Sequence, residues 1–106
     1  MKNQLWHILI IDDSPDDRAD LRQMLLRGSD RRYRFSEAEL GADGLRQLQQ
    51  TREGPYDCIL LDYCLPDMNA EELLAAFCAG ADLPPCPVVV VTGSGRADGR
   101  KLLRAG

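Results

Sequence analysis

Four polar residues stand at the ends of apolar segments, and their types suit one kind of chemistry. Asp12 and Asp13 follow the apolar run ILII, Asp62 follows CILL, and Thr92 closes VVVVT. Ligands of open parallel sheets bind at the carboxyl ends of the strands. If the three runs are neighbouring strands, we expect three carboxylates and one hydroxyl group to converge on a small area.

Such a group of carboxylates favours a divalent cation. Three carboxylates within a few ångströms of one another oppose each other's ionisation unless a counter-charge is present. Mg²⁺ supplies this charge and binds through one or two carboxylates, carbonyl oxygens and water. A cation beside a carboxylate also neutralises an incoming phosphate, and the carboxylate then becomes a candidate nucleophile for phosphoryl transfer. The hydroxyl group of Thr92 can donate to a phosphoryl oxygen.

The elements that must position these residues alternate along the chain. Apolar or alternating segments predict strands, and spaced leucines between helix-start and helix-stop residues predict helices. Ser14 is the expected N-cap of the first helix, with Pro15 at its first position and Gly28 at its end. The expected strands are 7–12, 33–38, 57–61 and 88–92, and the expected helices are 14–28, 41–52, 70–79 and a last one containing Leu102 and Leu103. This order predicts one α/β domain with a parallel sheet and helices on both faces.

Composition narrows the function classes. The 106 residues fit a single domain, and a net charge of -4 gives no electrostatic reason to expect nucleic acid or an anionic membrane as a partner. No run approaches the roughly 20 apolar residues of a membrane helix. The N-terminus does not have the pattern of a signal peptide, so we expect a cytoplasmic protein.

Other sites fit the sequence poorly. Cys58, Cys64, Cys78 and Cys86 contain no C-x₂-C pair and His7 is the one histidine, so zinc is not expected. The segment TGSGRADG lacks the spacing of a dinucleotide loop, and no Gly-Lys-Ser/Thr sequence of a P-loop is present. Asp57 and Asp67 are interpreted as surface acids.

Four segments, in this order, resemble the receiver domain of two-component response regulators of the chemotaxis-regulator type. They are IIDDSPDD, CILLDYCLPDMNAEELL, VVVVTGSG and LLRAG, and together they extend over nearly the whole chain. The resemblance implies a flavodoxin-like, doubly wound parallel sheet of strand order 2-1-3-4. It also implies a phosphoprotein of two-component or phosphorelay signalling, a regulatory domain that catalyses only its own phosphorylation and dephosphorylation.

The resemblance also assigns roles. Asp62 is expected to accept a phosphoryl group from a histidine kinase or phosphotransfer protein. Asp12, Asp13, Asp62 and the backbone carbonyl of Cys64 are expected to hold Mg²⁺. Thr92 is the expected switch residue, and Cys64 and Ser94 are expected to lie beside the phosphate and to tune its hydrolysis.

The sequence departs from the family at its C-terminal end. The family has a lysine at the end of a fifth strand, whereas this chain contains only Lys2 and Lys101, neither at a matching position. We therefore expect residues 1–106 to be a receiver domain without its fifth strand and fifth helix, with an output domain following in the full-length protein. The strand 88–92 would then be an exposed apolar edge through which two copies could dimerise.

Two other functions remain open. The runner-up is a pseudo-receiver, a protein-interaction module that is not phosphorylated. The third is a small Mg²⁺-dependent phosphatase with an aspartate nucleophile, although that class has a second aspartate where Cys64 stands.

Overall fold

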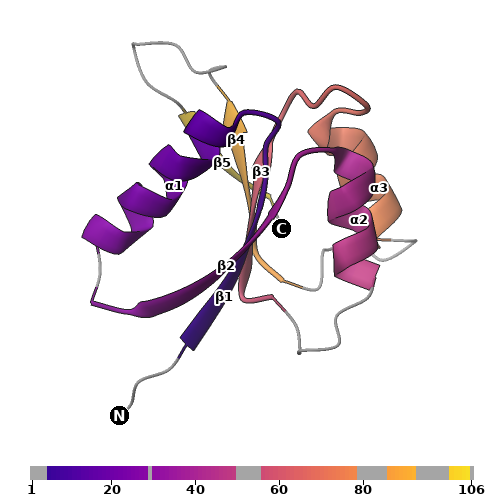
Figure 1. The fold of residues 1–106 in the computed structure, drawn as a ribbon. Helices are drawn as coiled ribbons and strands as arrows, with labels where there is room; N and C mark the ends of the chain where they lie inside the picture. The colour runs from indigo at the N-terminus through magenta and orange to yellow at the C-terminus, as the bar shows by residue number, and fades with distance from the viewer. Residues whose placement is uncertain (1–4, 29, 50–55, 79–85, 93–100, 106) are drawn as a thin grey trace.

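A central sheet separates two layers of helices in the computed structural model (Figure 1). The structure describes residues 5–28, 30–49, 56–78, 86–92 and 101–105. In chain order the elements are β1 (Leu5–Ile11), α1 (Pro15–Arg27), β2 (Arg32–Ala38), α2 (Gly41–Gln49), β3 (Cys58–Asp62), α3 (Ala70–Cys78), β4 (Val88–Thr92) and β5 (Lys101–Ala105). None of the helices within these residues is long and apolar enough to cross a membrane.

The sheet confirms the predicted parallel strand order. Its order is β2-β1-β3-β4-β5, and the pairs β1–β2, β1–β3 and β3–β4 are parallel. Ile11 pairs with Leu61, and Asp62 pairs with Val91. The carboxyl ends of β1, β3 and β4 therefore lie beside one another at one edge of the sheet.

The last element is a strand, so the prediction of a helix containing Leu102 and Leu103 is wrong. Lys101–Ala105 forms β5, which pairs antiparallel with β4 from Val88↔Ala105 to Thr92↔Lys101. Leucine and arginine favour helices locally, but the free edge of an apolar strand offers backbone hydrogen bonds that a short helix does not match. The prediction that β4 is an exposed edge is wrong for the same reason, because β5 covers it, and dimerisation through β4 has no free edge to use.

Both faces of the central strands are buried, which explains their continuous apolar runs. In β1, Leu9 and Ile11 belong to the core beneath α2 and α3, whereas Ile8 and Ile10 belong to the core beneath α1. Figure 1 shows α1 on one side of the sheet and α2 and α3 on the other. Helices on both faces hold the acidic ends of β1 and β3 in fixed positions.

The predicted boundaries of α1 are confirmed. The Oγ atom of Ser14 accepts a hydrogen bond from the backbone N–H of Asp17 at 3.2 Å, and Pro15 begins the helix. Gly28 ends the helix, and its N–H donates to the carbonyl of Met24 at 3.2 Å. The N-cap residue thus lies two positions after Asp12, so the acidic pair leads directly into a well-defined helix start.

Gly44 allows α2 to lie directly against β1. A Cβ atom at this position would meet Ile11 Cδ1 at 2.5 Å and Cγ1 at 3.0 Å, and Ile11 is fully buried. Because Ile11 directly precedes Asp12, this contact sets how closely α2 approaches the acidic end of β1.

We expect Gly44→Ala to lower the free energy of unfolding by about 1–2 kcal/mol, because overpacking costs more than the gain of roughly 1 kcal/mol in helix propensity. Denaturant unfolding checks this. Combining the variant with Ile11→Val, which removes Cδ1, is expected to recover part of the loss beyond the sum of the single changes. Strict additivity of the two substitutions would contradict the contact.

Candidate functional site

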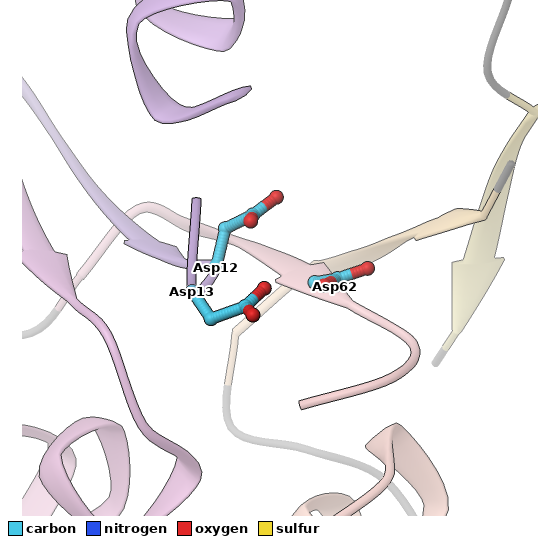
Figure 2. A group of neighbouring side chains, drawn as sticks. All are labelled: Asp12, Asp13 and Asp62. Carbon is cyan, nitrogen blue, oxygen red and sulfur yellow. The ribbon is translucent and has the colours of Figure 1, made fainter. Parts of the chain in front are cut away.

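Three carboxylates meet at the carboxyl edge of the sheet. Asp12 and Asp13 follow β1, Asp62 is the last residue of β3, and one carboxylate oxygen from each lies within 4.8 Å of the others. Figure 2 shows the three side chains extending in the same direction from the ends of the two strands. The structure thus brings together the acidic residues that the sequence places at strand ends.

Asp12 is fixed within this group. Its side chain is buried, with only 2% of the surface of the residue exposed. Its backbone N–H donates to the carbonyl of Ala38 at 3.0 Å, and its Oδ1 accepts from the N–H of Ser14 at 2.9 Å. These bonds hold the Asp12 carboxylate in place within the group, whereas Asp13 is exposed.

The environment of Asp62 opposes its ionisation. Burial is the largest cause, followed by the negative charges of Asp12 and Asp13, and together they raise the pKa of Asp62 to about 6. A hydrogen bond from the backbone of Cys64 acts in the opposite direction. With this pKa, Asp62 is still mostly ionised at neutral pH. A bound cation would stabilise its charged form further.

Arg18 of α1 contributes a contact that the sequence did not reveal. Its guanidinium group donates to the backbone carbonyl of Asp12 and to Glu37 Oε1, the latter at 2.7 Å, and Arg22 pairs with Glu37 Oε2. Glu37 lies near the end of β2, so these ion pairs tie α1 and β2 to the acidic end of β1. In the sequence, Arg18 has the pattern of an ordinary solvent-exposed arginine on a helix. Its partners, Glu37 and the backbone of Asp12, are identified only by the structure.

The loop between β3 and α3 carries Cys64. This residue is exposed, and its backbone forms an isolated antiparallel bridge with Asn69. The N–H of Leu65 donates to the carbonyl of Met68 at 3.1 Å, and the N–H of Ala70 donates to the carbonyl of Tyr63 at 2.8 Å. The loop is therefore a closed turn that returns the chain to the level of Asp62.

Two predicted residues remain, Thr92 and Ser94. Thr92 ends that strand, one position beyond Val91, which pairs with Asp62, and Ser94 lies outside the described residues. Lys101 was expected on a helix, but the register places its backbone opposite Thr92. Lys101 was excluded as the counterpart of the family's fifth-strand lysine because it was expected on a helix. That reason no longer holds.

The donor set suits a hard divalent cation. All three side chains offer carboxylate oxygens, and neither histidine nor thiolate contributes to the group. Mg²⁺ prefers such oxygen ligands and keeps several waters, which suits a site with one exposed member.

Comparison with known proteins agrees with this geometry. The family model "Response regulator receiver domain" matches residues 8–106. Two-component response regulator ORR1 of Oryza sativa subsp. japonica is 34% identical over 89 residues, which cover 80% of this chain and 38% of that protein. The chain thus spans well under half of the length of this relative.

Solved structures show the same fold. The Mn²⁺-bound form of response regulator Rcp1 superposes with a TM-score of 0.67 at 33% identity, covering 88% of this chain and 69% of that one. The phosphorylated cyanobacterial phytochrome response regulator RcpA superposes with a TM-score of 0.67 at 28% identity, covering 90% and 70% of the two chains.

Proposed function

Because the chain belongs to the response regulator receiver domain family, we propose that it is a phospho-acceptor switch in which Asp62 receives a phosphoryl group in the presence of Mg²⁺. The observation that carries this proposal is the convergence of Asp12, Asp13 and Asp62 within 4.8 Å. The Rcp1 structure with Mn²⁺ and the phosphorylated RcpA structure support it, since both chains share this fold.

The proposed step is a direct transfer to a carboxylate. An oxygen of ionised Asp62 attacks phosphorus and forms the acyl phosphate, while the bond from phosphorus to the donor histidine nitrogen breaks and the imidazole leaves. When bound, Mg²⁺ would neutralise part of the charge on the phosphoryl oxygens. Asp12 and Asp13, with the backbone carbonyl of Cys64, would hold this ion. Burial and neighbouring charges raise the pKa of Asp62 to about 6, so the nucleophile is mostly ionised at pH 7 even before the ion binds.

Thr92, Cys64 and Ser94 are proposed to respond to the phosphoryl group. Thr92 follows the residue that pairs with Asp62, so its hydroxyl group is the proposed donor to a phosphoryl oxygen and the proposed switch. Cys64 and Ser94, each two positions after Asp62 and Thr92, are proposed to tune hydrolysis of the acyl phosphate.

The partners follow from the same proposal. A histidine kinase or phosphotransfer protein would donate the phosphoryl group, and the domain would act as a regulator that catalyses only its own phosphorylation and dephosphorylation. Because the rice relative extends far beyond the matched part, we also propose an output domain in the full-length protein. A net charge of -4 favours neither nucleic acid nor an anionic membrane as the partner of this domain.

We expect one phosphoryl group to be added when the protein is incubated with Mg²⁺ and acetyl phosphate, because this small donor needs no kinase surface. Intact-mass spectrometry detects the addition. Borohydride reduction, which converts an acyl phosphate of aspartate to homoserine, followed by peptide mapping locates it. Homoserine at position 62 is the expected result, and the same incubation with excess chelator is the control. Absence of any adduct with Mg²⁺ present would favour the pseudo-receiver.

A further inference from the structure

Helix α2 lacks a capping side chain of its own. The carbonyl of Leu40 accepts the first intrahelical hydrogen bond, from the N–H of Gly44 at 3.0 Å, so Leu40 is the N-cap residue. Leucine has no side-chain acceptor for the free N–H groups of the first turn. Leu40 is also 36% exposed, so its side chain is not required in the core.

The cap comes instead from a distant part of the chain. Asp67, in the loop between β3 and α3, accepts from the N–H of Gly41 through Oδ1 and from the N–H of Ala42 through Oδ2, both at 2.9 Å. These two bonds lower the pKa of Asp67, which agrees with a carboxylate held in its charged form. Such charge-assisted bonds at a helix N-terminus are stronger than neutral ones.

A second contact lies beside the cap. A Cβ atom on Gly41 would meet Met68 Cγ at 2.5 Å, so the residue after Asp67 packs against the bare backbone at the start of α2. On its other side the loop joins α3, where Asn69 and Glu72 exchange bonds of 2.9 and 2.8 Å between side chain and backbone. The loop is therefore held between the first turns of two helices.

We propose that Asp67 is a positioning residue for the metal site. By capping α2 from the loop, it holds the backbone of Cys64 in the position in which its carbonyl can bind Mg²⁺. This inference rests on the proposed role of that carbonyl. Cys64 lies two residues after Asp62 and three before Asp67, so the segment is held at one end by β3 and at the other by α2. The hydrogen bond between the N–H of Leu65 and the carbonyl of Met68 makes this turn rigid. Fixing Asp67 therefore also restrains Cys64.

The decisive experiment compares Asp67→Ala with the double variant Leu40→Asn/Asp67→Ala. Both variants lose the tether between loop and helix, but asparagine at position 40 gives α2 a local cap. We expect Asp67→Ala to lower the melting temperature by about 4–8 °C, as for the loss of one cap, and to weaken Mg²⁺ binding about tenfold. The double variant is expected to regain the melting temperature while Mg²⁺ binding stays weak.

Calorimetric titration with magnesium chloride measures the affinity, and amide hydrogen exchange at Leu65 reports the loop without metal. Faster exchange is expected in both variants. Asp43→Ala is the control for charge, because Asp43 is in the first turn of α2 but pairs with Arg46 at 2.9 Å. We expect this control to keep the parent affinity within about twofold, since surface pairs contribute little.

The outcomes separate the two proposals. If the double variant regains both melting temperature and Mg²⁺ affinity, Asp67 acts only through stability and the positioning role is overturned. Unchanged exchange at Leu65 in Asp67→Ala also overturns it. If the parent itself does not bind Mg²⁺, the proposed function fails and the metal part of the inference fails with it, whereas the exchange result still decides whether Asp67 holds the loop.

Discussion

Replacing Asp62 with asparagine is expected to abolish the phosphoryl adduct and, in metal-free buffer at pH 7, to stabilise the fold. The amide of asparagine is not a nucleophile toward acetyl phosphate, so the adduct disappears. The same change removes one of three carboxylates whose oxygens lie within 4.8 Å of one another. The proposed phospho-acceptor is then a source of instability in the unphosphorylated protein.

The sign of the stability change follows from the pKa of Asp62, which burial and the charges of Asp12 and Asp13 raise from 3.8 to about 6. Well below pH 4 the carboxyl group is protonated in both the folded and the unfolded chain, and it does not affect the free energy of unfolding. As the pH rises through 4 to 6, the unfolded chain releases its proton first, so the free energy of unfolding falls. Above pH 6 the full penalty remains, about 1–2 kcal/mol once solvent screening of this half-buried group is considered.

Chemical denaturation between pH 4 and pH 7.5, with chelator present, measures this effect. The parent is expected to lose stability across the range relative to Asp62→Asn, and the difference between the two curves should be smallest near pH 4. Asp20→Asn, at an exposed position of α1, is the matched control and should follow the parent. A parent curve parallel to that of Asp62→Asn would show that neither burial nor the neighbouring carboxylates raise the pKa of Asp62 in solution.

The sequence was sufficient for the parts of the fold that depend on short-range pattern. Apolar runs that end in aspartate predicted β1 and β3, and Ser14-Pro15 predicted the start of α1. Strand order then brought Asp12 and Asp62 to one edge, because parallel neighbours have their carboxyl ends on the same side. The candidate site could be predicted since each of its acidic residues is adjacent to a strand.

The parts that were missed depend on contacts between distant segments. Asp67 is exposed, as expected of a surface acid, but its capping role was missed because its partners at the start of α2 lie 25 and 26 residues away. Lys101–Ala105 has helix-forming residues, and only the neighbouring edge of β4 makes it a strand. Arg18 gave no sign of its bond to the backbone of Asp12, since a backbone acceptor leaves no trace in the sequence.

One signal for the cap was nevertheless present. A leucine at the N-cap position supplies no side-chain acceptor, so the first N–H groups of such a helix are satisfied by water or by a polar group from elsewhere. Leu40, directly before Gly41, therefore leaves the N–H groups of the first turn without a local side-chain acceptor. Asp67, in a loop at the same edge of the sheet, supplies that acceptor.

The second large effect concerns Asp13, the exposed member of the site. We expect Asp13→Asn to weaken Mg²⁺ binding about 100-fold, since even residues that only support metal ligands contribute 10- to 100-fold. Asp13 is exposed and follows β1 rather than lying within it, so its replacement should leave the folded structure intact. Asp12 is a poorer choice for this test, because its buried carboxylate also accepts from the N–H of Ser14.

Thermal unfolding with increasing Mg²⁺ measures the effect through linkage. Ligand at about 100 times its dissociation constant stabilises a folded protein by roughly 2.7 kcal/mol, so the parent should melt at a clearly higher temperature in saturating Mg²⁺. At the same concentration Asp13→Asn should show almost no shift, while Asp16→Asn, an exposed aspartate in the first turn of α1, should respond like the parent. An equal shift in all three proteins would mean that Mg²⁺ acts on the general negative charge, and the assignment of Asp13 as a ligand would be wrong.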